Sequence, residues 1–283
     1  MRRAILAVAA VVGAVAALVA CAPAALFNLT VPRGGYRIEK DVAYGADPRQ
    51  RLDLYIPDRV KAHAPVLLFF YGGSWQSGSK DLYLAFGQAF ASEGVIVAIA
   101  DYRVYPQVSY PLFLGDAASA LAYVHANAAR LGGDPARVFV AGHSAGAYNA
   151  VMLASDPRYL AAVHGDFGWI RGVIGIAGPY DFLPLEDKKL IALFGGADRI
   201  ETQPIHYIDG KRPPMLLAAG LDDTTVRPAN TERMAKRLRD AGGEAEVKLY
   251  PGVGHIGIIL SIAEPFRGKA PLRADMLAFI AAH

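Results

Sequence analysis

Runs of consecutive apolar residues recur along the chain, and most lead into glycine-containing turns and then into apolar residues at helical spacing. A strand buried on both faces of a sheet gives an unbroken apolar run, because neither face meets water. These runs predict strands at residues 65–71, 95–100, 138–141, 172–177 and 214–219, and a less apolar one at 245–250 near a sheet edge. Helical spacing predicts helices at 81–92, 111–131, 147–154, 229–241 and 272–282.

The order of these elements defines the fold class. Strands alternate with helices from Val66 onward, which predicts an α/β chain with a mostly parallel sheet and helices on both of its faces. Residues 36–44 and 51–56 alternate between apolar and polar instead, and they predict an antiparallel N-terminal hairpin that borders the sheet. Residues 183–210 mix proline, glycine and charges without a period, and we expect them to form a small cap over one end of the sheet.

The N-terminal segment differs from the rest of the chain. After Arg2 and Arg3, residues 4–27 carry no charge, which is typical of a signal peptide or a membrane anchor. Residues 18–21, Leu-Val-Ala-Cys, resemble the lipobox of bacterial lipoproteins, in which the cysteine is lipidated and becomes the new N-terminus. We therefore expect Cys21 to be a lipidation site.

This expectation divides the chain into a lipoprotein-type signal peptide at 1–20, a linker at 21–35 and one folded domain at 36–283. The signal peptide would export the domain, and a lipid on Cys21 would attach it to a membrane, facing the periplasm or the cell surface. The alternatives are an uncleaved signal-anchor and ordinary cleavage without a lipid.

The composition argues against several classes of function. With 283 residues, 53% of them hydrophobic, the chain is long enough for one domain with a sizeable core. The formal net charge is only +3 and no basic patch is interleaved with aromatic residues, so no nucleic-acid partner is expected. Cys21 is the only cysteine, which excludes an internal disulfide and a thiolate metal cluster, and no metal site is predicted. The oligomeric state stays open.

One segment, Gly142-His-Ser-Ala-Gly146, joins a predicted strand to a predicted helix. This Gly-x-Ser-x-Gly pattern between strand and helix is typical of a nucleophilic serine, here Ser144, held in a strained turn with its hydroxyl exposed. His143 neighbours the serine, but we expect its side chain to point away from the serine hydroxyl. The alternative is a glycine-rich turn that contains an incidental serine.

A serine hydroxyl needs a positioned base, and the base needs a carboxylate that orients it. His255 follows the last strand in a glycine-rich loop and is the leading candidate for the base, with His206 of the cap as its rival. Asp222 and Asp223 follow the preceding strand, and either is available as the carboxylate. The carboxyl ends of parallel strands meet at one edge of a sheet, so we expect these residues to converge on Ser144.

The turn after the strand at 65–71 adds a further feature, Tyr71-Gly-Gly-Ser-Trp75. The tetrahedral intermediate of acyl transfer needs backbone donors aimed at its oxyanion. Glycines after a buried strand let the backbone approach a substrate closely. We expect the oxyanion donors to be the N–H groups of Gly73 and Ser74, together with that of Ala145 at the start of the following helix.

Taken together, these features make the chain similar to carboxylesterases of the α/β-hydrolase superfamily, in the hormone-sensitive-lipase-like and feruloyl-esterase-like group. The matching stretches are 71–75, 101–103, 132–138, 142–146, 220–223 and 254–255. The resemblance runs from Tyr36 to the C-terminus and implies the α/β-hydrolase fold. Its acid loop favours Asp223 over Asp222. The sequence departs from the group at Tyr71, where relatives usually have histidine, and at Ser74, where many have glycine.

The resemblance implies that residues 36–283 are a catalytic domain that hydrolyses a small-molecule ester. Ser144 attacks the carbonyl, His255 takes its proton and Asp223 orients His255, so that an acyl-enzyme forms and is hydrolysed. No metal or organic cofactor is implied. Two alternatives stay open: an amidase or peptidase of the formamidase or prolyl-peptidase type on the same triad, and a non-catalytic hydrolase-like binding module. The sequence leaves the acyl chain and the alcohol of the substrate open.

Overall fold

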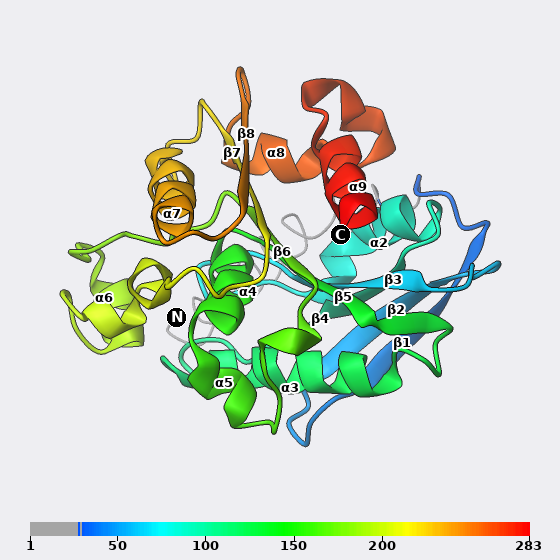
Figure 1. Cartoon of the computed structure of the whole chain (residues 1–283), viewed down its shortest axis with the longest axis horizontal. Helices are drawn as coiled ribbons and strands as arrows, with labels where there is room; N and C mark the ends of the chain where they lie inside the picture. Colours follow the sequence, from blue (N-terminus) through cyan, green and yellow to red (C-terminus); the bar gives the residue numbers. More distant parts are fainter. Residues whose placement is uncertain (1–27, 29) are drawn as a thin grey trace, which may run out of the picture. The chain divides into compact units, whose positions relative to one another are not determined.

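The computed structural model describes residue 28 and residues 30–283, and these residues contain one sheet of eight strands (Figure 1). In chain order the strands are β1 (Tyr36–Ala43), β2 (Arg51–Pro57), β3 (Ala64–Phe70), β4 (Ile96–Ala100), β5 (Gly133–His143), β6 (Gly172–Ile176), β7 (Met215–Gly220) and β8 (Ala245–Tyr250). Across the sheet they follow the order β1-β2-β4-β3-β5-β6-β7-β8. β2 pairs antiparallel with both β1 and β4, and every other neighbouring pair is parallel. The predicted mostly parallel sheet with an antiparallel N-terminal hairpin is confirmed.

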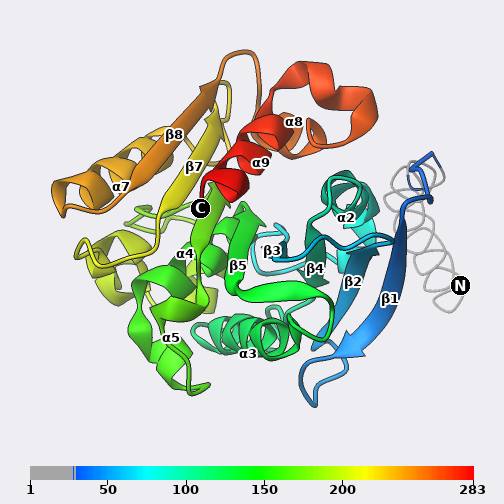
Figure 2. The ribbon, with the colours of Figure 1, turned by 45° about the vertical axis from the view of Figure 1, so that its right-hand side comes forward.

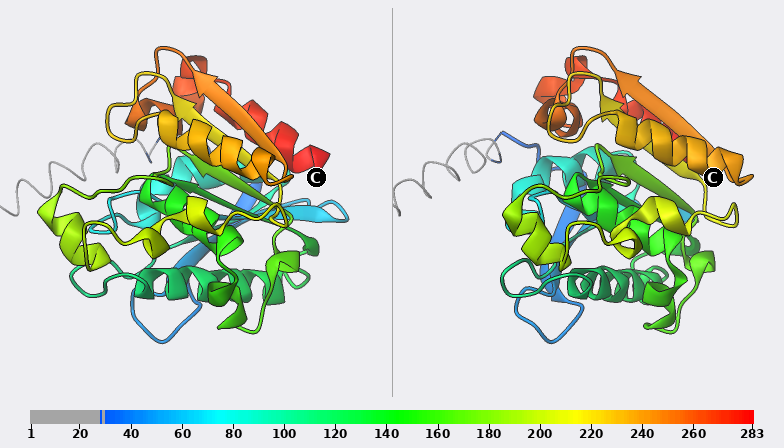
Figure 3. Two further views of the ribbon diagram at one scale, coloured as in Figure 1. Left: turned by 60° about the vertical axis from the view of Figure 1, so that its left-hand side comes forward. Right: turned by 90° about the vertical axis from the view of Figure 1, so that its left-hand side faces the viewer.

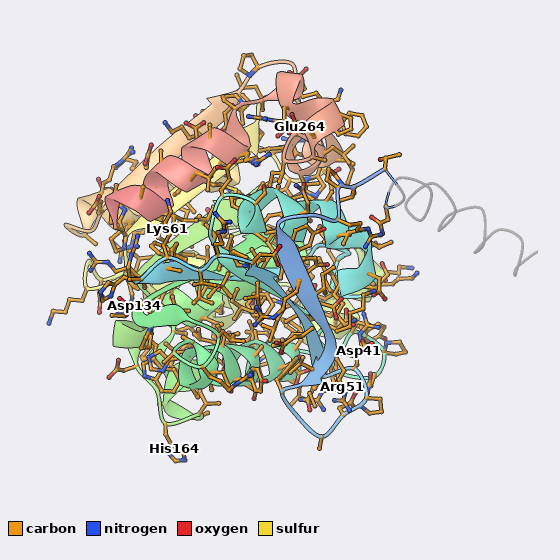
Figure 4. All side chains as sticks on the ribbon, turned by 90° about the vertical axis from the view of Figure 1, so that its right-hand side faces the viewer. Asp41, Arg51, Lys61, Asp134, His164 and Glu264 are labelled. Carbon is orange, nitrogen blue, oxygen red and sulfur yellow. The ribbon has the colours of Figure 1, made fainter. Side chains whose placement is uncertain are left out.

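Burial explains the apolar runs of the inner strands. Every residue of β4, β6 and β7 is buried, because helices cover both faces of the sheet there. The edge strand β1 keeps exposed residues and bends at Asp41, which has a φ of 54° and lies where the register with β2 shifts. Figure 4 shows this bend, with Asp41 and Arg51 near the hairpin turn. The one buried carboxylate of β2, Asp53, lies 3.0 Å from the ammonium group of Lys80.

Helices pack on both faces of the sheet, as predicted (Figure 2). One face carries α2 (Leu84–Ala91) and α9 (Leu272–Ala282), and the other carries α3 (Leu112–Asn127), α4 (Ala145–Ser155) and α7 (Ala229–Asp240). Shorter elements join them: η1 (Lys80–Tyr83), α5 (Pro157–Ala161), η2 (Phe167–Trp169), α8 (His255–Leu260) and η5 (Glu264–Lys269). Every residue of α4 is buried, which explains why this helix is made of small and apolar residues. It contacts β3, β5 and β6, so its first turn is fixed firmly against the middle of the sheet.

Residues 183–210, between β6 and β7, form the cap segment. It contains α6 (Lys188–Phe194), η3 (Ile200–Thr202) and η4 (Pro204–Tyr207) and lies beside α4 (Figure 3). Tyrosine hydroxyls fasten it there. The hydroxyl of Tyr148 donates to the carbonyl oxygen of Thr202 at 2.6 Å, and that of Tyr110 donates to the carbonyl oxygen of Glu201 at 2.8 Å. The cap segment is therefore tied to α4 and to the start of α3 by its backbone carbonyls.

Four details differ from the predictions. The cap segment contains a helix and two 3-10 turns where the sequence indicated only irregular structure. β5 begins at Gly133, five positions before the predicted start, so its exposed and charged first residues belong to the strand. α3 ends at Asn127 although helical spacing continued to 131. His255 is the first residue of α8 and does not lie within a loop. The glycines before it indicated a loop, although a short helix begins directly after them.

Contacts divide the chain into two compact units, Met1–Arg33 and Gly34–His283, and the sheet belongs to the second. The predicted signal peptide and the lipidation site Cys21 lie outside the described residues. In the first unit, the guanidinium of Arg33 donates to the carbonyl oxygen of Asn28 at 3.2 Å. Among residue 28 and residues 30–283, no helix has both the length and the apolar character that crossing a membrane requires.

Candidate active site

Ser144 occupies a sharp turn between the end of β5 and the start of α4. Its φ of 55° and ψ of −123° are values that only glycine adopts easily, so the backbone is strained at Ser144. The flanking glycines make the turn possible. A Cβ atom on Gly146 would collide with the carbonyl oxygen of Phe70, and one on Gly142 would collide with that of Gly146. The close approach of strand and helix therefore requires both glycines, and it leaves the serine hydroxyl at the carboxyl end of the sheet.

The hydroxyl of Ser144 begins a chain of two hydrogen bonds. Its Oγ lies 2.9 Å from Nε2 of His255, whose Nδ1 lies 2.7 Å from Oδ2 of Asp223. A carboxylate only accepts, so Nδ1 carries the imidazole proton and Nε2 is free to accept the proton of the serine hydroxyl. The side chain of Asp223 is fully buried and that of His255 is 11% exposed. Three residues from the ends of β5, β7 and β8 thus meet in the geometry of a nucleophile, a base and an orienting acid.

Burial distinguishes the two aspartates. The second oxygen of Asp223, Oδ1, accepts hydrogen bonds from the N–H groups of Thr225 and Val226, both at 2.9 Å. These bonds fix the carboxylate with Oδ2 toward His255. Asp222 is exposed to solvent beside it. The rival base, His206, is also exposed, on η4, whereas His255 is the histidine that contacts the serine.

The loop after β3, residues 72–78, lies directly against the turn that carries Ser144. A Cβ atom on Gly72 would lie 2.9 Å from Cβ of Ser144, so only glycine fits where this loop passes the serine. Gly73, Ser74 and Trp75 all have positive φ, at 133°, 52° and 56°. Successive residues of this kind turn the backbone sharply at the serine. Ala145 follows Ser144 as the first residue of α4, where helix N–H groups have no partner within the helix.

The hydroxyl of Tyr71 anchors this loop. It donates to Oδ1 of Asp101 at 2.6 Å and accepts from the guanidinium of Arg49 at 3.0 Å. Arg49 also donates to the carbonyl oxygen of Gly78 at 2.6 Å, at the far end of the loop. Burial raises the pKa of Tyr71, and the neighbouring Asp101 carboxylate raises it further, so the hydroxyl keeps its proton. Tyr71 therefore joins both ends of the loop through Arg49.

Sequence reasoning missed Arg49, because an arginine in the turn of a hairpin has no motif that marks it. Asp101 accepts hydrogen bonds from the hydroxyl of Tyr71 and from the N–H of Lys80, the latter at 2.8 Å. The guanidinium of Arg103 lies 2.6 Å from the buried carboxylate of Asp116, on α3.

Aromatic side chains fill the space between this loop and the cap segment. Trp75 is 3% exposed, and its ring centroid lies 5.0 Å from those of Tyr148 and Phe194. Phe182 stacks on the same indole at 6.4 Å. The indole N–H donates to Oδ1 of Asn149 at 3.0 Å, which fixes the ring. The wall of the site on this side is therefore apolar and rigid.

Comparison with known proteins places this geometry in a family. The family model BD-FAE matches residues 52–238. The chain is 30% identical, over 82% of its length and 53% of the relative's, to the probable isoprenylcysteine alpha-carbonyl methylesterase ICMEL1 of Arabidopsis thaliana. It is also 30% identical to esterase LipC of Mycobacterium tuberculosis, over 78% of its length and 60% of the relative's. The chain thus spans about half to three fifths of the length of these curated relatives.

Solved structures share the fold. A truncated carbohydrate esterase from gut microbiota superimposes with a TM-score of 0.75 at 20% identity, covering 89% of this chain and 98% of that one. Esterase 2 of Thermogutta terrifontis, solved with propionate bound, superimposes with a TM-score of 0.71 at 25% identity, covering 87% of this chain and 95% of that one. The chain belongs to the BD-FAE family, and its fold is that of the α/β-hydrolase carboxylesterases.

Proposed function

We propose that the protein is a serine hydrolase that cleaves carboxylic esters. The observation that carries this proposal is the unbroken chain of hydrogen bonds from Ser144 through His255 to buried Asp223, next to a loop with consecutive positive φ values. The names of the relatives, methylesterase and esterase, support the same reaction.

In the proposed mechanism, Ser144 Oγ attacks the ester carbonyl while His255 Nε2 takes the hydroxyl proton. The negative charge that develops on the carbonyl oxygen is held by the N–H groups of Gly73, Ser74 and Ala145. Asp223 stabilises the imidazolium that forms.

The imidazolium then protonates the departing alkoxide, and an acyl-enzyme on Ser144 remains. A water molecule that has lost a proton to His255 attacks the acyl-enzyme. The imidazolium then returns this proton to Ser144 Oγ as the bond to the acyl group breaks, so that the serine is restored and the carboxylic acid is released.

Short acyl esters are the substrates that we propose to test first. Three aromatic side chains fill the space beside the loop at 72–78: Trp75, Tyr148 and Phe194. They make this side of the site apolar and closed, which favours a short acyl group. The similar esterase 2 of Thermogutta terrifontis has been solved with propionate bound, which is a short carboxylic acid.

Replacing the nucleophile tests the proposal. Ser144→Ala should lower kcat for p-nitrophenyl butyrate by about 10⁴-fold or more and leave the fold intact, because removal of a triad nucleophile has effects of this size. Ser119→Ala, on the outer side of α3, serves as the control and should retain activity. Turnover of the ester by a pure Ser144→Ala preparation would sink the proposal.

The two other functions call for different measurements. An amidase on the same triad would also turn over a p-nitroanilide, whereas an esterase would cleave only the p-nitrophenyl ester with the same acyl group, so both substrates belong in the assay. A non-catalytic module would leave Ser144 unmodified by a fluorophosphonate probe, whereas an activated serine reacts with it.

We further propose that residues 1–20 are a lipoprotein signal peptide and that Cys21 carries a lipid, which attaches an exported catalytic domain to a membrane. The uncharged segment after Arg2 and Arg3 and the lipobox-like sequence before Cys21 support this proposal.

A further inference from the structure

His143 precedes the nucleophile, and none of the proposed steps uses it. It is 3% exposed, at the end of β5. Its Nε2 lies 3.0 Å from the backbone carbonyl oxygen of His255, and the centroids of the two imidazole rings are 4.8 Å apart. A buried histidine therefore contacts the backbone of the residue whose side chain faces Ser144.

The contact determines where the proton of His143 lies. A carbonyl oxygen only accepts, so Nε2 must carry the proton and donate. Nδ1 is buried, and it has no hydrogen-bond partner among the described residues. It faces the loop after β3, where a Cβ atom on Gly72 would lie 3.1 Å away. A second proton on Nδ1 would be a buried donor without an acceptor, so the ring is neutral.

Electrostatics agree with this assignment. Burial lowers the pKa of His143 to about 3, and the nearby positive charge of His255 lowers it in the same direction. His143 thus remains a neutral donor throughout the pH range in which an ordinary histidine titrates. It also adds no positive charge beside the imidazolium that forms on His255.

The hydrogen bond from His143 to the backbone of His255 completes a closed loop of contacts among three residues. His143 and Ser144 are neighbours in the chain, the His143 ring holds the backbone of His255, and the His255 ring reaches back to Ser144. The backbone before His255 contains Gly252, at φ 72°, and Gly254, and α8 itself has only six residues. This segment is held to the loop after β7, where the N–H of Asp222 donates to the carbonyl oxygen of Val253 at 3.0 Å, and the contact with His143 adds a second tie, to the end of β5.

We propose that His143 is a positioning residue: its Nε2–H ties the backbone of His255 to the strand end that carries Ser144, and so sets the distance between base and nucleophile. This inference rests on the proposed function of Ser144 and His255. A misplacement of about 1 Å in an active site lowers the rate by roughly 10²-fold, so a tie of this kind has a measurable effect.

A matched pair of variants separates the hydrogen bond from simple packing. In His143→Gln, the amide nitrogen reaches about as far as Nε2 and keeps a donor, whereas His143→Met has similar length and no donor. Both variants lose the ring, so any contribution of the ring contact is lost equally. The full-length protein is used, and the thermal midpoint of unfolding of each variant is recorded beside its kinetics.

We expect His143→Met to lower kcat for p-nitrophenyl butyrate by about 10- to 100-fold while KM changes by less than about threefold, because a displaced base affects the chemical step. The rate at which a fluorophosphonate modifies Ser144 should fall by the same factor. His143→Gln should stay within about threefold of the natural protein in both measurements. A wild-type rate in His143→Met, or an equal loss in both variants, contradicts the proposal.

The fluorophosphonate reaction keeps the two proposals distinguishable. It needs Ser144 and His255 but no ester, so a natural protein that reacts with the probe and cleaves no ester would contradict the proposed function alone.

A measurement on the natural protein needs no variant. In ¹⁵N-histidine NMR spectra, His143 should be neutral with its proton on Nε2 from pH 7 to about pH 4. A cationic ring at pH 5, or a proton on Nδ1, would overturn the proposal whether or not either variant folds.

Discussion

At Asp223, one carboxylate serves two structural purposes. Oδ2 faces the imidazole of His255, and Oδ1 accepts two backbone N–H groups in its own loop. The loop bonds prevent rotation of the carboxylate, so that Oδ2 stays in line with the ring. Asp222, one position earlier, is exposed and has no such constraint.

We therefore predict different kinetic effects for substitutions at the two aspartates. Asp223→Asn should lower kcat by about 10³- to 10⁴-fold, since an amide in this position favours the wrong tautomer of the histidine. Asp222→Asn removes the same charge in a solvent-exposed position and should change kcat by less than about threefold. Steady-state assays of both variants on one p-nitrophenyl ester provide the comparison, and a larger effect at Asp222 would mean that the acid has been assigned to the wrong residue.

Motifs locate residues of this kind only when the signal is local. The Gly-x-Ser-x-Gly segment around Ser144 and the Gly220–Asp223 loop could be recognised from consecutive residues. Both contain residues that meet in the structure. Two other contributions could not be predicted. Arg49 reaches the loop after β3 from a hairpin, and His143 holds a carbonyl 112 positions away in the chain. Neither contact has a signature in the sequence around it.

At the scale of elements, the joint between β5 and α4 is packed so closely that it requires glycine on both sides of Ser144. β3 passes so close to α4 that the carbonyl oxygen of Phe70 occupies the space that a side chain on Gly146 would need. By contrast, a Cβ atom on Gly115, in α3, would meet nothing within 4 Å. A side chain is therefore excluded by packing at Gly146 in α4, whereas the space around Gly115 in α3 can accommodate one.

This contrast predicts opposite changes in stability. Gly146→Ala should lower the free energy of unfolding by about 3 kcal/mol or more, or prevent soluble expression, because a backbone clash cannot be relieved by a rotamer change. Gly115→Ala should raise it by about 0.5–1 kcal/mol, since alanine is the better helix former. Urea unfolding followed by circular dichroism measures both values. Equal stability of the two variants would show that α4 can move away from β3.

Elements with a clear period could be predicted from the sequence, and elements set by tertiary contacts could not. Apolar runs marked the strands of the sheet core, and helical spacing marked α7 and α9 within one residue of their ends. The cap segment shows no period because its 3-10 turns are held by tyrosine hydroxyls from other elements. α8 was missed because six residues after a glycine-rich turn carry too little periodicity to distinguish a helix from a loop.

At the scale of the whole molecule, His143 links the site to acid stability. Its pKa is lowered to about 3 in the folded protein, while an unfolded chain takes up the same proton near pH 6.5. Between these values the unfolded state binds more protons, so the free energy of unfolding falls as the pH decreases.

We therefore predict that His143→Met has a flatter stability profile than the natural protein. The slopes should differ by up to about 1.4 kcal/mol per pH unit between pH 6 and pH 4, because the variant has no proton to bind in the unfolded state. Urea unfolding at several pH values measures the slopes. Parallel profiles would mean that the histidine titrates alike in both states.

The N-terminal proposal makes a prediction about the mature chain. In a bacterial host, the protein recovered from the membrane fraction should begin at Cys21 and carry a diacylglyceryl group, because the signal peptide is removed at the modified cysteine. Intact mass spectrometry detects both changes. Cys21→Ala should abolish the lipid and leave the chain uncleaved at this position. A natural protein that retains Met1, or that begins elsewhere with a free thiol, would refute the prediction.

The sheet order also has a consequence for the timing of activity. Ser144 and His255 are 111 positions apart, and His255 lies after the last strand to be synthesised. Contacts of such long range form late in folding, after the loops between them have closed. No partial chain that ends before β8 contains the base. In the proposed mechanism, hydrolysis can therefore begin only once β8 has joined the sheet, so that a chain still in synthesis leaves surrounding esters intact.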